Sequence, residues 1–185
     1  EQIETLSQIG KIMGEYPVYV RTLDVGGDKT IPYLKLPVEA NPFLGIRSIR
    51  LSLRTPEIFQ TQLRAILRAG VNFDIRVMFP MISTIDEVIP ILECLEQAHQ
   101  SLKDENLPHR WPVETAMMIE TPSAALLMSS FVKYVNYFSI GTNDLTQYTL
   151  AAERGNPELV DYADALHPAV LRLIREVVKV AHQHS

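Results

Sequence analysis

The sequence contains little of what marks secreted, disulfide-bonded or membrane-spanning proteins. Its 185 residues include a single cysteine, Cys94, which excludes an intrachain disulfide framework and favours a reducing, cytoplasmic location. Cys94 falls in an amphipathic run and is expected to be a buried helix thiol. No apolar run approaches the roughly 20 residues of a membrane span. The first residues lack the basic region and apolar core of a signal peptide, and the absence of an initiator Met suggests a segment of a longer protein.

An excess of positive charge is also absent. Lysine and arginine number 17 against 22 aspartate and glutamate residues, which gives a net charge of -5. Nucleic acid is therefore not expected as a partner, because it would favour a basic face. An anionic ligand is not excluded, because a local arginine cluster can override the overall sign. At 46% hydrophobic residues, the chain has enough apolar material for a core.

What the sequence does contain is a regular alternation of short apolar strands and amphipathic helices. Strands are predicted over residues 18–21, 75–79, 113–119 and 135–140. Helices are predicted over residues 5–16, 46–53, 56–69, 84–103, 121–131, 143–150 and 169–183. This alternation is typical of βαβ units with a parallel sheet. A closed (β/α)8 barrel needs eight strands and typically about 250 residues, so we expect an α/β fold that is either a small open domain or about half a barrel, with residues 1–185 forming a single partial domain.

Two carboxylates lie where predicted strands give way to loops. Glu120 follows one strand, and Asn143 and Asp144 follow the next, so the carboxylates are 24 residues apart, about one helix plus one strand. They would meet at the carboxyl ends of neighbouring parallel strands, where parallel barrels bind ligands. Mg2+ usually takes only one or two carboxylates from a protein, so this pair suits it. The alternative is that both are helix N-terminal acids that interact with the helix dipole.

Arginines lie close to the same predicted strand ends. Arg21 ends the first strand ahead of two glycines, Arg47 begins a predicted helix, and Arg154 follows Asp144 closely enough to fold back over the strand ends. An arginine in such a position suits carboxylate or phosphate binding. For Arg47 the alternative is a solvated surface side chain, and Arg50, one turn later, is expected to be one.

Taken together and in order, these segments resemble the phosphoenolpyruvate-binding domain of the phosphoenolpyruvate-protein phosphotransferase family, Enzyme I of the bacterial sugar phosphotransferase system. The resemblance covers nearly the whole chain. It is carried by residues 21–29, 41–50, 77–81, 119–122 and 139–155. The wider relatives are pyruvate phosphate dikinase and phosphoenolpyruvate synthase, and the form of residues 139–148 is closest to Enzyme I. The resemblance implies a (β/α)8 TIM barrel, of which this chain would contain strands three to six.

The resemblance also implies roles for individual residues. Glu120 and Asp144 would hold Mg2+. The phosphate and carboxylate of phosphoenolpyruvate would be clamped by Arg21, Arg47 and Arg154, and Asn143 would add a polar contact. The parent transferase would move the phosphoryl group to a histidine and on to a phosphocarrier protein, releasing pyruvate. The accepting histidine and the acid cysteine of the family would lie outside this chain, so the chain alone is not expected to turn over phosphoenolpyruvate.

Two other interpretations stay open at the level of the sequence. The chain could be a segment of pyruvate phosphate dikinase or of phosphoenolpyruvate synthase, and an ATP requirement of the parent would distinguish these. It could also be a dimerisation module without chemistry. Family members dimerise through this domain, and half a barrel exposes two sheet edges, so a homodimer is expected.

Overall fold

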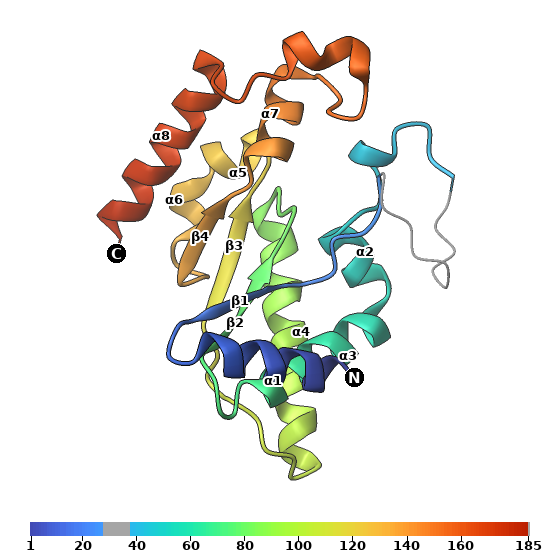
Figure 1. Ribbon diagram of the computed structural model, residues 1–185, viewed down its shortest axis with the longest axis vertical. Helices are drawn as coiled ribbons and strands as arrows, with labels where there is room; N and C mark the ends of the chain where they lie inside the picture. The colour runs from blue at the N-terminus through green and yellow to red at the C-terminus, as the bar shows by residue number, and fades with distance from the viewer. Residues whose placement is uncertain (28–37, 185) are drawn as a thin grey trace.

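A four-stranded parallel sheet forms the centre of the computed structural model, which describes residues 1–27 and 38–184 (Figure 1). The strand order is β1-β2-β3-β4. The strands are β1 (Val18–Arg21), β2 (Ile75–Phe79), β3 (Thr115–Ile119) and β4 (Tyr137–Ile140). All three pairings are parallel, with Val18 opposite Ile75, Val77 opposite Thr115 and Ala116 opposite Tyr137. Parallel strands that follow one another in both sequence and space require a crossover between each pair, which confirms the predicted βαβ pattern.

Helices lie in the connections between the strands, ahead of β1 and after β4. They are α1 (Gln2–Met13), α2 (Ile49–Arg54), α3 (Pro56–Ala69), α4 (Ile85–Asp104), α5 (Pro122–Leu126), α6 (Met128–Phe131), α7 (Thr142–Leu150) and α8 (Pro168–Gln183), with short 3-10 helices η1 (Pro42–Leu44) and η2 (Pro157–Tyr162). Helix α3 packs on α4 and on α1, while α5 and α6 pack on α8. No helix in the described part of the chain is both long and apolar enough to cross a membrane.

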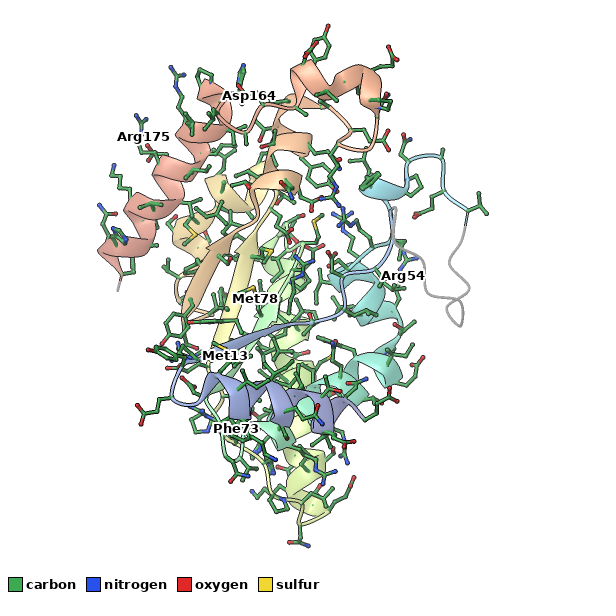
Figure 2. All side chains as sticks on the ribbon, in the orientation of Figure 1. Met13, Arg54, Phe73, Met78, Asp164 and Arg175 are labelled. Atoms are coloured by element: carbon green, nitrogen blue, oxygen red, sulfur yellow. The ribbon has the colours of Figure 1, made fainter. Side chains whose placement is uncertain are left out.

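The hydrophobic core lies between the sheet and the helices that pack on it. Burial alternates along β2. Ile75, Val77 and Phe79 are buried, whereas Arg76 and Met78 on the other face are only partly covered. The Phe79 ring meets the ring of Phe59 from α3 edge-to-face, with 6.5 Å between centroids. One face of the sheet is therefore dry, and Met78 marks the middle of the less covered face (Figure 2). An open four-stranded sheet of this kind agrees with the predicted partial barrel.

Most predicted elements are confirmed, and apart from one divided helix the differences lie at their ends. Helix α3 and strand β2 have the predicted bounds, and α4 begins at a capping box of Thr84 and Glu87, as expected for a first turn rich in acids. The single helix predicted over residues 121–131 is wrong, because the backbone leaves helical geometry at Leu127 and divides the segment into α5 and α6. Cys94 lies in α4, as predicted, but is half-buried rather than buried, and burial raises the pKa of its thiol.

Candidate anion- and cation-binding site

The polar residues singled out above gather at the carboxyl ends of the strands. Helix α7 and the segment that leads into α2 lie at this end of the sheet, while α1 crosses near the opposite end (Figure 1). Nitrogen-bearing side chains fill the space between α7 and the segment that leads into α2 (Figure 2). One end of the sheet therefore collects residues from distant parts of the chain.

Arg47 is the centre of this cluster, and only 2% of it is exposed. Its Nη1 donates to Asp144 Oδ1 at 3.0 Å and to the Tyr148 hydroxyl at 3.1 Å, and its Nη2 donates to Asp24 Oδ1 at 3.3 Å. Burial acts to lower the pKa of Arg47, but these partners outweigh burial and raise it above its ordinary value. The guanidinium group therefore stays charged, and the expectation of a solvated surface side chain is excluded.

The local backbone is shaped to bring Arg47 inward. Gly26 has φ of 108°, and a Cβ there would lie 2.5 Å from the Cβ of Arg47, so no larger residue fits this close approach. The next residue after the arginine, Ser48, has φ of 54° and donates its N–H to the carbonyl of Val25 at 2.8 Å. The left-handed turn at Ser48 is uncommon for a residue other than glycine. The segment that contains Gly26 and the segment that contains Ser48 are thus held together next to Arg47.

Two aspartates link Arg47 to the other predicted arginines. Asp24 Oδ2 accepts from Arg21 Nη2 at 2.7 Å, and Asp144 Oδ2 accepts from Arg154 Nη1 at 3.2 Å. The result is a continuous chain of ion pairs from Arg21 through Asp24, Arg47 and Asp144 to Arg154. The side chains of Arg21 and Arg154 are 38% and 28% exposed, so the chain runs from a buried centre to two accessible ends.

Glu120 lies beside this chain and is 1% exposed. It follows β3 directly, and its Oε1 accepts the N–H of Met81 at 3.0 Å, where the backbone has a positive φ of 57°. Burial raises the pKa of Glu120 to about 7; Asp144 and Asp24 add to this, and the Met81 N–H opposes it. Near neutral pH the Glu120 carboxyl is therefore divided between its protonated and ionised forms.

Asn143 and Asp144 lie just beyond the end of β4, where the sequence predicted them. Both lie in the first turn of α7, within the helix predicted over residues 143–150, so Asp144 is also the helix N-terminal acid that the alternative interpretation expected. Asp144 is buried, whereas Asn143 is exposed on the rim. Asn143 lines a cavity of about 250 Å3 together with Arg154 and Gln147, and the Gln147 Oε1 accepts the Arg154 N–H at 2.9 Å. The structure thus brings Asn143 next to Arg154 but outside the buried ion pairs.

Sequence reasoning missed two residues of the site, Asp24 and Tyr148. Asp24 bridges two arginines, and its position three residues after Arg21 is the signal that could have identified it. Tyr148 follows Asp144 by one helical turn and so faces the same side of α7. Arg50 lies outside the ion-pair chain and has 40% of its side chain exposed, as expected of a surface arginine, although it also bonds to Glu87 Oε1 at 3.2 Å and to the carbonyl of Leu44 at 3.3 Å.

The arrangement can bind an anion and a hard cation together. Three arginines converge on one place, and guanidinium groups pair with carboxylate and phosphate oxygens. The described residues include no group of three or more histidine, cysteine or acidic side chains placed to hold a metal ion. Glu120 and Asp144 still offer oxygen donors of the type that Mg2+ prefers, and Mg2+ takes its remaining ligands from water and substrate phosphates.

Comparison with known proteins gives a family match over the whole chain. The family model described as the PEP-binding domain of PEP-utilising enzymes matches residues 1–185. The chain is 47% identical to a phosphoenolpyruvate-protein phosphotransferase of Priestia megaterium, over 100% of this chain and 32% of the relative. It is 49% identical to a multiphosphoryl transfer protein of Rhodobacter capsulatus, over 98% of this chain and 21% of that protein. The chain thus spans about a third of the length of the phosphotransferases that it matches.

A solved structure supports the fold. A citrate lyase from Burkholderia xenovorans LB400 superposes with a TM-score of 0.55 at 14% sequence identity, covering 98% of this chain and 48% of the other. At that identity the likeness speaks for the α/β architecture alone. This chain aligns with about half of a larger chain, which is consistent with an open partial barrel.

Proposed function

Because this chain belongs to the family of PEP-binding domains of PEP-utilising enzymes, we propose that it is the phosphoenolpyruvate-binding part of a phosphoenolpyruvate-protein phosphotransferase. In this proposal residues 1–185 form one partial barrel domain. The parent protein is a cytoplasmic transferase that moves the phosphoryl group of phosphoenolpyruvate to a histidine and on to a phosphocarrier protein. It acts as a homodimer and releases pyruvate.

The observation that carries the proposal is the chain of ion pairs centred on Arg47. A guanidinium group held at 2% exposure by two aspartates is costly to desolvate, and such a group is rarely built for stability alone. Phosphoenolpyruvate carries a phosphate and a carboxylate, which are the two groups that arginines bind in a forked geometry. Arg21 and Arg154, at the accessible ends, meet the ligand first, while Asn143 contributes a polar contact from the rim.

Glu120 and Asp144 are the residues that would hold Mg2+. Their donor set fits a cation that keeps open positions for ligand oxygens, and both are buried beside the arginines that pair with Asp144. When bound, Mg2+ supplies positive charge that offsets the charge on the phosphoryl group and on the departing enolate. The protein's own contribution is to fix the arginines in place and to keep the site dry, so that these charges act at full strength.

The test is a calorimetric titration of phosphoenolpyruvate into the 185-residue chain, with and without Mg2+. We expect binding that requires Mg2+ and that weakens at least tenfold in Glu120→Ala, since one of two metal-holding carboxylates is lost. The matched control is Glu114→Ala. Glu114 precedes β3 as Glu120 follows it, and it pairs with Arg76 at the other end of the sheet.

Equal affinity in the wild type and in Glu120→Ala contradicts the assignment of Glu120, and equal losses in both variants contradict a site confined to the carboxyl end. The chain alone is expected to release no pyruvate when mixed with a phosphocarrier protein. Pyruvate release under those conditions contradicts the placement of the accepting histidine outside residues 1–185.

A further inference from the structure

One aromatic ring lies against two of the clustered arginines. Phe43, in η1, has the guanidinium carbon of Arg47 at 5.7 Å from its ring centroid, and that of Arg154 at the same distance. Cations within about 6 Å of an aromatic centroid are attracted by the negative face of the ring. The two arginines come from different ends of the chain, so Phe43 is a shared support rather than a local neighbour.

Tyr148 fixes the position of Phe43. Its hydroxyl donates to the Phe43 carbonyl at 2.5 Å and accepts from Arg47 Nη1 at 3.1 Å. A tyrosine hydroxyl has one proton to donate and lone pairs to accept with, so the two bonds are compatible. Burial raises the pKa of Tyr148, which keeps that proton on the hydroxyl at neutral pH. Tyr148 therefore connects the backbone of η1 to the buried guanidinium group.

Other contacts hold η1 in place without using the arginines of the site. Both carboxylate oxygens of Glu39 accept the N–H of Ile46 at 3.1 Å, which closes the segment into a loop. Arg50 Nη1 donates to the carbonyls of Leu44 and Gly45 at 3.3 and 3.4 Å. Because neither contact involves Arg21, Arg47 or Arg154, η1 is held independently of the arginines of the site.

We propose that Phe43 and Tyr148 are positioning residues for the anion-binding arginines. This inference rests on the proposed function, because it assigns the ring and the hydroxyl to the same anion site. A guanidinium group that lies on an aromatic face keeps its N–H edge free for an anion. The ion pairs with Asp144 differ, because they occupy the N–H groups that the anion needs. The ring therefore orients both arginines without competing for their donors.

The first experiment measures phosphoenolpyruvate affinity with Mg2+ present, and separately the affinity for Mn2+ alone, in Phe43→Leu, Phe43→Tyr and Tyr148→Phe. Phe43→Leu is expected to weaken phosphoenolpyruvate binding about tenfold, because two cation–ring contacts are lost. Phe43→Tyr keeps the ring and stays within about twofold of the wild type. Tyr148→Phe is expected to weaken binding about fivefold, since the bonds of its hydroxyl with the Phe43 carbonyl and with Arg47 are lost. Mn2+ affinity stays unchanged in the Phe43 variants, because neither carboxylate is touched.

The second measurement does not depend on phosphoenolpyruvate. Nitrogen-15 spectra of the arginine side chains report ring-current shifts and mobility, and Phe43→Leu is expected to change the signals of Arg47 and Arg154 but not that of Arg76. If the wild type binds no phosphoenolpyruvate yet these signals change, the proposed function fails while the positioning role holds. Unchanged arginine signals, or equal losses of affinity in Phe43→Leu and Phe43→Tyr, overturn the inference.

Discussion

Two arginines, one at each end of the sheet, pair with carboxylates and aromatic rings in different ways. Arg76 lies in β2 toward the amino ends of the strands, and Arg47 lies at the carboxyl ends. Arg76 bonds to Asp74 Oδ2 at 2.8 Å and to the Tyr19 hydroxyl at 2.7 Å, pairs with Glu114 at 2.9 Å, and lies 4.5 Å from the centroid of Tyr137. Its side chain is 15% exposed. Arg47 is more deeply buried, and among the described residues its Nε has no hydrogen-bond partner.

The difference separates an arginine that stabilises the fold from one that is held ready for a ligand. Arg76 has its charge balanced by two acids that water also reaches, so its environment is complete. Arg47 shares its two aspartates with Arg21 and Arg154, so each carboxylate is divided between two cations. Such sharing leaves positive charge available to an anion. Burial makes that charge strong, because the surrounding dielectric is low.

The largest expected effect comes from removing each arginine in turn. Arg47→Met is expected to lower the free energy of unfolding by about 3 kcal/mol, the lower end of the range for breaking a buried pair, since each aspartate keeps a second arginine. Arg76→Met is expected to cost about 1 kcal/mol, because its partners are partly solvated. Urea denaturation followed by circular dichroism measures both. Equal costs would remove the distinction between the two clusters.

A smaller effect is expected from the pH dependence of Glu120. Its pKa in the folded chain is raised to about 7, so the folded state binds more protons than the unfolded state between the ordinary carboxyl pKa and 7. The wild type therefore loses stability as pH rises through this window, whereas Glu120→Gln does not ionise. Relative to that of the wild type, the free energy of unfolding of Glu120→Gln is expected to increase by about 2 kcal/mol between pH 5 and pH 8. Parallel pH profiles of the two unfolding free energies would contradict this.

The smallest effect is expected at Asp74, where the contribution to stability changes with pH in the opposite direction. The hydrogen bond from Arg76 lowers the pKa of Asp74, so its contribution to stability is present above the ordinary carboxyl pKa and is lost as pH falls through the folded-state value. Asp74→Asn is expected to cost less than about 1 kcal/mol at pH 7, and less still at high salt. Unfolding in about 1 M salt is the control, because charges at the protein surface are largely screened from one another at that ionic strength. A cost that grows toward acidic pH would be inconsistent with this pairing.

The sequence was sufficient where local signals decide the structure. Helix α3 starts at Pro56 and ends before Gly70, and β2 ends before Pro80, so a proline or glycine marks where each element ends. The spacing of the apolar residues then identifies one element as a helix and the other as a strand. The break at Leu127 was not predictable, because no glycine or proline marks it. There the packing of α5 and α6 on α8 decides the backbone, and that packing is tertiary.

Some residues of the candidate site could likewise be predicted from the sequence, whereas the contacts between them could not. Arg21, Glu120 and Asp144 stand out because each follows an apolar run, and a strand end can be read from the sequence. The contact of Tyr148 with Phe43 joins residues 105 positions apart, and the contact of Arg47 with Asp144 joins residues 97 apart. No local pattern specifies such pairs. They follow from the order of the strands in the sheet and from the two left-handed turns at Ser48 and Met81.

Those left-handed turns, at Ser48, Met81 and also at Ala151 after α7, have a consequence for protein engineering. A residue with a Cβ is disfavoured in this conformation by roughly 1 kcal/mol relative to glycine. A campaign to raise the melting temperature by glycine substitution would therefore select these positions, together with Asn106 after α4. Ser48 adjoins Arg47, Met81 donates its N–H to Glu120 and Ala151 ends α7, so a variant changed at these positions would need its ligand affinity checked before use. Thermal stability and ligand binding thus place opposing demands on the same short segments of backbone.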